Sequence, residues 1–91
     1  MKGEAPDFGS IDYAETFGRN LRKMRREING LSLEETSVRL KNVGMPMDTK
    51  TLSKMELGRR KRIDVRELEA LAYVLKCPIR ALWMPTTGVK L

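Results

Sequence analysis

The sequence of 91 residues contains no histidine and only one cysteine, Cys77. The absence of histidine excludes a histidine-ligated zinc site and a histidine acid–base catalyst. One cysteine cannot form a disulfide within the chain, so a reducing cell interior is the expected setting. No helix face gathers a cluster of carboxylates, and Cys77 lacks the context of a reactive thiol. We therefore expect no enzyme activity, no cofactor, no metal and no small-molecule ligand.

Long apolar runs are also missing. No segment approaches the roughly 18 consecutive apolar residues of a membrane-spanning helix. Glu4 and Asp7 stand where a signal peptide would carry its apolar core. These features predict a soluble, cytoplasmic protein without a membrane partner.

Basic residues are abundant and unevenly placed. The net charge is +6 and the isoelectric point is near 9.8. Residues 1–16 carry a net charge of −3, whereas residues 17–31 and 48–62 carry +4 each. A basic chain favours a polyanionic partner, and the two basic segments would have to meet on one side of the fold to serve it.

Helical periodicity begins at Asp12. Residues 1–11 mix Gly, Pro and charge without a period and are predicted to be a flexible arm. Asp12 and Glu15 have the spacing of a capping box, and the apolar stripe that follows predicts a helix ending near Gly30. The stripe comprises Tyr13, Phe17, Leu21, Met24 and Ile28, and the opposite face carries Arg19, Arg22, Lys23 and Arg26.

Two short helices follow in tandem. Ser32 and Glu35 form a second capping box, and the helix they open has Leu33, Thr36, Ser37 and Leu40 at inner positions. Residues 41–47 form a connection. Asp48 is the expected cap of a helix over residues 49–57, which turns Leu52 and Met55 inward and stops at Gly58.

The remaining pattern is helical as well. Asp64 and Glu67 form a further capping box, and Pro78 suits the first turn of a last short helix ending at Trp83. Inner positions of the fourth helix are Val65, Leu68, Leu71, Ala72 and Leu75. With five helices and no strand pattern, we predict one all-α domain over residues 12–84, followed by a tail over residues 85–91.

The third helix carries the candidate recognition residues. A 100° step places Lys50, Lys54 and Leu57 opposite the inward face, flanked by Thr51 and Ser53. Like charges four residues apart cost an isolated helix about 0.2 to 0.5 kcal/mol, a cost that phosphates or guanine edges would reverse. The alternative is an ordinary solvated face. The predicted base contacts are Thr49, Lys50, Thr51, Ser53 and Lys54.

A basic loop follows Gly58. Guanidinium groups bind phosphate bidentately, so a loop of this composition suits a nucleic-acid backbone, with solubilising surface as the alternative. On the first helix, Arg22 is a weaker candidate of the same kind. The predicted phosphate contacts are Ser32, Arg59, Arg60, Lys61, Arg62 and Arg22.

The run LSLEETSVRL…MDTKTLSKMELGRRKRIDVRELEALAYVLKCPIRAL resembles the Xre/Cro, or lambda-repressor-like, helix-turn-helix family over about residues 14–84. The resemblance implies a compact five-helix domain with the helix-turn-helix at the second and third helices. It also implies a sequence-specific regulator of transcription on double-stranded DNA, bacterial or phage-encoded and nucleoid-associated. Residues 49–57 would enter the major groove, with the second helix lying across it.

The resemblance has three departures and one structural implication. Thr36 and Ser37 replace a usual Leu-Ala, the connection over residues 41–47 is about four residues longer, and one extra residue precedes Gly30. In the family, an arginine of the first helix pairs with the glutamate at position 56. By the apolar stripe that arginine is Arg25, which follows Met24, and the predicted structural pair is Arg25 with Glu56; the extra residue leaves Arg26 as the alternative.

The C-terminal helix leaves two interpretations open. Trp83 either covers the bottom of the small core or joins Leu82 and Met84 in a weak homodimer assembled on DNA. The alternative function is that of an antitoxin or adaptor whose main role is binding a protein partner. Such a role would need a large apolar patch, for which the candidates are Met45, Met47, Trp83 and Met84.

Overall fold

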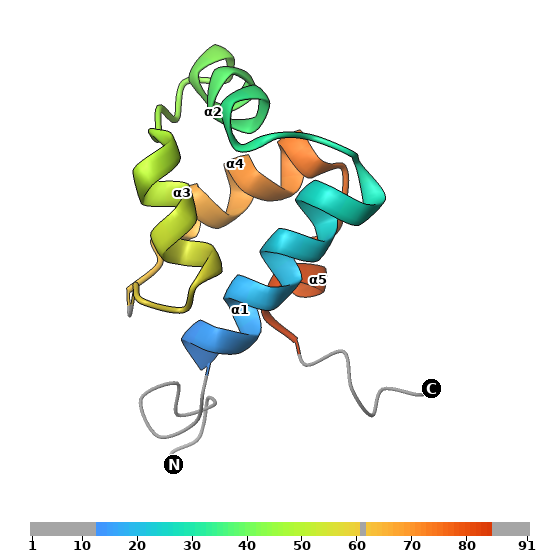
Figure 1. The fold of residues 1–91 in the computed structure, drawn as a ribbon, viewed down its shortest axis with the longest axis vertical. Coiled ribbons are helices and arrows are strands. Elements are labelled where there is room, and N and C mark those ends of the chain that lie inside the picture. Colours follow the sequence, from blue (N-terminus) through green and yellow to red (C-terminus); the bar gives the residue numbers. More distant parts are fainter. Residues whose placement is uncertain (1–12, 61, 85–91) are drawn as a thin grey trace.

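The structure is a computed structural model that describes residues 13–60 and 62–84. Within this part of the chain all regular structure is helical, as predicted (Figure 1). The elements are α1 (Tyr13–Arg22), the π-helical η1 (Lys23–Ile28), α2 (Leu33–Asn42), α3 (Thr49–Glu56), α4 (Val65–Leu75) and α5 (Arg80–Trp83). The predicted arm, the Asp12 cap and the predicted tail lie outside the described residues. No helix of the described part is long and apolar enough to cross a membrane.

One small core joins all the helices. α3 packs against α1 and α2, α5 packs against α1, and α4 packs against α2. Because each helix presents one apolar stripe, the core forms where these stripes meet. The largest fully buried apolar side chains are Phe17, Leu21, Leu40, Leu52, Met55, Leu71, Leu75 and Leu82.

Side-chain caps fix where three helices begin. Ser32 with Glu35 caps α2, and Asp64 with Glu67 caps α4, each pair forming both bonds of a capping box. The Asp48 carboxylate accepts a hydrogen bond from a backbone N–H in the first turn of α3. These signals are local in the sequence, and all three are confirmed.

The first helix differs from its prediction near its end. Ile28 was expected to complete the apolar stripe, but it is 60% exposed, whereas Arg25 is 8% exposed. The reason is η1, whose backbone bonds span five residues and therefore take up one residue more than an α-turn. The extra residue shifts the inward face of the helix from Ile28 to Arg25.

α4 and α5 bring smaller corrections. Val65, expected inside, is 64% exposed because it lies in the first turn at the open end of α4. Val74 was not expected inside, yet it is buried beside Arg39 at the α2 side of the helix. The last helix begins at Arg80, two residues after Pro78, whose carbonyl accepts the first backbone bond of that turn.

Candidate nucleic-acid interface

α3 presents a polar and cationic face to solvent. Lys50 and Lys54 are exposed, and Leu57, which follows the helix, is 58% exposed. On the opposite side Leu52 and Met55 are buried. The predicted division of this helix into inner and outer faces is therefore confirmed. Thr49, Thr51 and Ser53 are partly exposed between the two faces.

The N-terminus of α3 already holds an anion of its own. The Asp48 carboxylate accepts the backbone N–H of Thr51 at 2.8 Å. That hydrogen bond, helped by the charge of Lys50, lowers the pKa of Asp48. Because the carboxylate occupies this helix end, it would repel an external phosphate there. Any contact of Thr49 with DNA would therefore be made by its side chain and not by the helix N-terminus.

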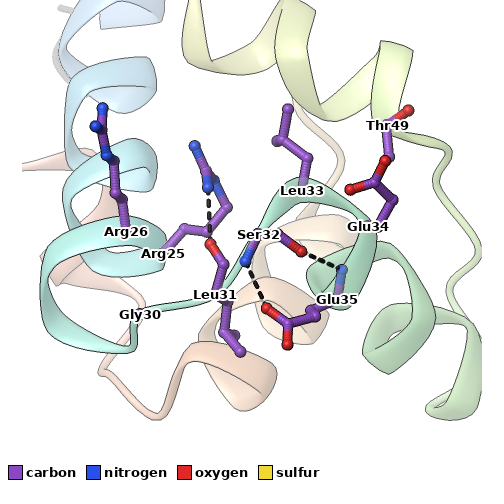
Figure 2. A pocket seen from close by; sticks show the side chains of 9 residues that line it. All are labelled: Arg25, Arg26, Gly30, Leu31, Ser32, Leu33, Glu34, Glu35 and Thr49. Atoms are coloured by element: carbon purple, nitrogen blue, oxygen red, sulfur yellow. Dashed lines mark hydrogen bonds between the residues drawn. The ribbon is translucent and has the colours of Figure 1, made fainter.

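A hollow of about 620 Å³ separates the starts of α2 and α3 from the end of η1 (Figure 2). It brings Ser32 and Thr49 to one surface together with Arg26, which is exposed. The hydroxyl of Ser32 accepts the N–H of Glu35 at 3.0 Å. Ser32 therefore serves as a helix cap. Arg26 is the exposed cation of this hollow, and the exposed carboxylates of Glu34 and Glu35 line it as well.

A second hollow, of about 630 Å³, runs along the outer side of α3 towards α4. Thr51 and Lys54 of α3 line it together with Arg59 and Arg60 of the following loop. Predicted base contacts and predicted phosphate contacts thus share one concave surface. Arg22 lines neither hollow and is exposed on α1.

The basic loop contains two kinds of arginine. Arg59 and Arg62 are exposed. Arg60 instead donates to the carboxylate of Glu67 at 2.9 Å, and its side chain is 32% exposed. Because Glu67 also caps α4, this ion pair fastens the loop to α4 and partly neutralises Arg60. Lys61 lies outside the described residues.

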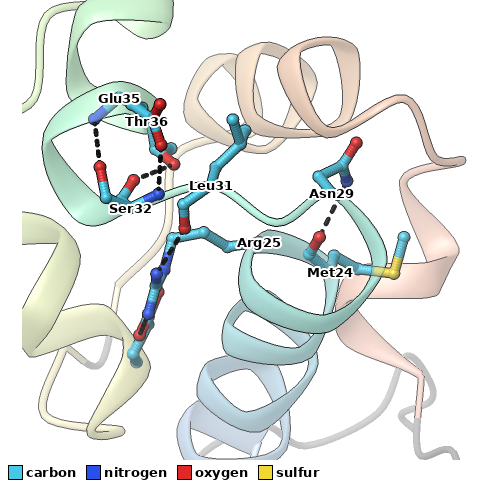
Figure 3. Close-up of polar contacts among 8 residues, drawn as sticks. Met24, Arg25, Asn29, Leu31, Ser32, Glu35 and Thr36 are labelled. Carbon is cyan, nitrogen blue, oxygen red and sulfur yellow. Dashed lines mark hydrogen bonds and ion pairs between the residues drawn. The ribbon is translucent and has the colours of Figure 1, made fainter.

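The end of α3 is tied to the first helix by an ion pair. Arg25 donates to both carboxylate oxygens of Glu56, at 2.5 and 2.9 Å, and these side chains are 10% and 8% exposed. A third guanidinium nitrogen donates to the carbonyl of Leu31 at 2.8 Å (Figure 3). The hydrogen bonds to Glu56 raise the pKa of Arg25. The structure thus pairs Glu56 with Arg25, whereas Arg26 is exposed on η1.

Gly18 is a positioning residue that the sequence analysis missed. A Cβ atom at this position would lie 2.5 Å from the carbonyl oxygen of Met55 and 2.6 Å from that of Glu56. Only glycine therefore allows the last turn of α3 to approach α1 this closely. An isolated glycine within a helical pattern is the signal that could have found it, because such a glycine often marks a close contact.

The two polar residues at inner positions of α2, Thr36 and Ser37, both form hydrogen bonds to backbone carbonyls. Thr36 is fully buried, and its hydroxyl donates to the carbonyl of Ser32 at 2.9 Å (Figure 3). Ser37 donates to the carbonyl of Met47 at 2.6 Å and so holds the connection between α2 and α3 against α2. Ser37 thus fixes the connection against α2, while the hydroxyl of Thr36 is satisfied within its own helix.

The C-terminal candidates divide between core and surface. Leu82 is fully buried in its own core, and Trp83 packs partly against that core, whereas Met84 is 41% exposed. Asn20 donates to the carbonyls of Leu82 and Met84 at 3.0 and 2.7 Å, which fastens the end of α5 to α1. Leu82 therefore has no surface to offer a second copy, and a dimer through this helix stays a prediction that would rest on Trp83 and Met84.

The apolar candidates for a protein partner do not gather into one patch. Met47 is buried, and Met45 packs partly against the core, as Trp83 does. Burial also raises the pKa of the Cys77 thiol, which disfavours the reactive thiolate. The described residues contain no group of three or more His, Cys, Asp or Glu that could hold a metal ion.

No protein-family model, curated protein or solved structure gives a significant match to this chain.

Proposed function

We propose that this chain is a sequence-specific double-stranded DNA-binding protein that regulates transcription by occupying an operator. In this proposal α3 enters the major groove, α2 lies across it, and the basic loop follows the phosphate backbone. The observation that carries the proposal is the surface on which Thr51 and Lys54 of α3 share one hollow with Arg59 of the loop. Groups suited to base edges and to phosphates thus lie side by side.

Two further features support the proposal. Neither Lys50 nor Lys54 forms an ion pair within residues 13–60 and 62–84, so both ammonium groups are available to a ligand. α3 is also held rigidly, by Gly18 at its last turn and by the Arg25–Glu56 pair. Base readout requires such a fixed helix, because hydrogen bonds to base edges tolerate little displacement. The resemblance to the lambda-repressor-like family points to the same function.

The test is selection of binding sites from random DNA duplexes, followed by affinity measurements with variants. Lys50→Ala and Lys54→Ala should each relax the preference at one or two base pairs, by roughly 1 to 3 kcal/mol. Arg59→Ala should lower the affinity for all duplexes by the same factor, because phosphate contacts carry no sequence information. Arg59 suits this comparison better than Arg60, whose guanidinium is engaged by Glu67.

Arg80→Ala is the matched control, because Arg80 is an exposed cation on α5, which packs against α1, and it lines neither hollow beside α3. This variant should leave both affinity and preference unchanged. If selection enriches no sequence, the protein is not a sequence-specific DNA-binding protein. If the lysine variants, like Arg59→Ala, lower the affinity for every duplex equally, the side chains of α3 do not contact the bases.

A further inference from the structure

A second surface lies where the long α2–α3 connection meets α4. Tyr73 of α4 is 74% exposed, and Val43 at the end of α2 is 43% exposed. These two side chains lie between two open hollows of about 460 and 470 Å³, and both hollows include them. Met45 and Ala70 add partly buried apolar surface to the second hollow. An exposed tyrosine between one mainly apolar hollow and one of mixed lining is typical of an interaction surface, where an apolar centre has a polar rim.

This surface is built before any partner arrives. The N–H of Met45 donates to the carbonyl of Leu40 at 2.9 Å, and that of Gly44 donates to the carbonyl of Lys41 at 3.0 Å. Gly44 has a φ of +87°, which the turn requires and which L side chains rarely adopt. The connection is therefore a fixed wall rather than a loose loop, so little ordering entropy opposes binding.

The surface is separate from the candidate nucleic-acid interface. No residue of α3 or of the basic loop lines either hollow. The residues that make its wall belong to the connection that is longer than the family pattern, and the proposed DNA contacts make no use of them.

Charge at the rim selects the occupant. Arg39 and Lys76 border one hollow, and Arg66 and Glu69 border the other. Neither Lys76 nor Arg66 forms an ion pair within the described part of the chain. Three cations against one carboxylate would repel the same rim of a second copy and attract an anionic segment. The apolar floor requires that this segment also carry an apolar side chain.

We propose that the surface formed by Val43, Met45, Ala70 and Tyr73 docks a short acidic segment of a partner protein. An aromatic or branched apolar side chain of that segment would lie beside Tyr73. Its Asp or Glu side chains would meet Arg39, Arg66 and Lys76. Such a contact would let a protein bound to DNA through α3 recruit a second protein on another face.

The experiment uses the full chain, labelled with ¹⁵N, and short synthetic peptides in which one Phe or Leu is flanked by Asp and Glu. Chemical-shift changes should saturate with peptide concentration and centre on Val43, Met45 and Tyr73. Matched peptides with Lys in place of the acids, or Ser in place of the apolar anchor, should bind about tenfold more weakly or worse. Tyr73→Ser and Arg66→Glu should each lower the affinity of the protein for the acidic peptide by about the same tenfold factor.

Matched controls separate the alternatives. Tyr73→Phe should retain binding, and Lys54→Ala, on the other surface, should leave it unchanged. The proposal is overturned if the acidic peptide shifts α3 and the basic loop instead, or if the lysine peptide binds equally well. It is also overturned if Tyr73→Ser abolishes a concentration-dependent dimer in sedimentation, because the surface would then bind a second copy of the chain. If Tyr73→Ser lowers the affinity for duplex DNA as much as the affinity for the peptide, the surface binds DNA and the proposal is again overturned.

Discussion

Arg25 and Glu56 illustrate how single residues set the position of a whole helix, α3. Their buried, bidentate pair lies at the junction of η1 and α3, and Arg25 also binds the carbonyl of Leu31. Bringing both charges out of water costs free energy that the attraction between them only partly offsets. The pair is therefore best understood as a device of orientation, which ties α3 and the start of α2 to the first helix.

Removal of Glu56 alone should destabilise the protein. Glu56→Ala leaves the guanidinium of Arg25 buried without its partner, and such a loss typically costs about 3 to 5 kcal/mol. We expect a lowered melting temperature together with lost DNA binding. Glu27→Ala, which removes an exposed carboxylate of η1, is the control and should be neutral. A variant with the wild-type melting temperature but weaker DNA binding would place Glu56 at the interface instead.

Gly18→Ala is a second prediction at this scale. Alanine favours a helix by about 1 kcal/mol over glycine, but its Cβ would collide with two backbone carbonyls of α3. Backbone atoms cannot move aside as side chains do, so overpacking of about 1 to 3 kcal/mol should outweigh the gain. Thermal unfolding measures the result, and Arg19→Ala, exposed on the same helix, is the control. A variant more stable than the wild type would show that α3 can withdraw from α1 without cost.

The positions of single residues were predictable where the helical period holds. Leu52, Met55 and the outward Lys50 and Lys54 follow from spacing alone, because α3 is a regular helix. The pairing of Arg25 with Glu56 was predicted from the stripe and the resemblance and is confirmed. The exposure of Ile28 was not predicted, because η1 changes the period just before that residue. The contact of Gly18 depends on a helix far away in the sequence, and local patterns do not report such contacts.

Whole elements were predicted well at their beginnings and less well along their faces. A cap is a contact between neighbours in the chain, so Ser32, Asp48 and Asp64 mark their helices from the sequence alone. Which faces become buried depends on how many partners a helix has. α4 packs against α2 as well as the central core, so Val74 is buried in addition to the single expected stripe.

The caps of α2 and α3 give the protein an acid-sensitive stability. The N–H of Ser32 lowers the pKa of Glu35 below its ordinary 4.5, and the N–H of Thr51 lowers the pKa of Asp48 below its ordinary 3.8. A carboxyl group whose pKa is lower in the folded than in the unfolded protein contributes its full stabilisation of the fold at pH values above its unfolded-state pKa. This contribution is lost as the pH falls through its folded-state pKa. The melting temperature should therefore start to fall as the pH drops to about 4.5 and continue to fall below that.

The double variant Glu35→Gln, Asp48→Asn tests the assignment. Its amide oxygens can still accept the capping hydrogen bonds, but neither side chain titrates in acid. Melting temperatures of variant and wild type, measured between neutral and acidic pH, should converge as the pH falls. Parallel curves would mean that other carboxylates cause the acid sensitivity.

At the scale of the whole molecule, the fold brings cations from different segments to the hollows that border α3. Arg26 of η1 lines the same hollow as Thr49 at the start of α3, and Arg59 lines the hollow along the outer side of α3. The ion pair by which Glu67 neutralises part of this surface was not predicted from the sequence, because it depends on how the basic loop lies against α4.

The dependence of DNA affinity on salt should report this arrangement. If each protomer neutralises about four to six phosphates, the logarithm of the association constant should fall against the logarithm of salt concentration with a slope of about −3.6 to −5.4. Arg60 is held by Glu67, so the slope should lie towards the weaker end of this range.

Replacing both Arg59 and Arg62 by alanine should reduce the slope by roughly 2, because each phosphate contact contributes about one. Arg80→Ala should leave the slope unchanged. Titrations of one duplex at several salt concentrations measure all three slopes. Affinity that does not respond to salt would contradict a DNA-binding function, whereas a steep slope unaltered in the double variant would move the phosphate contacts away from the basic loop.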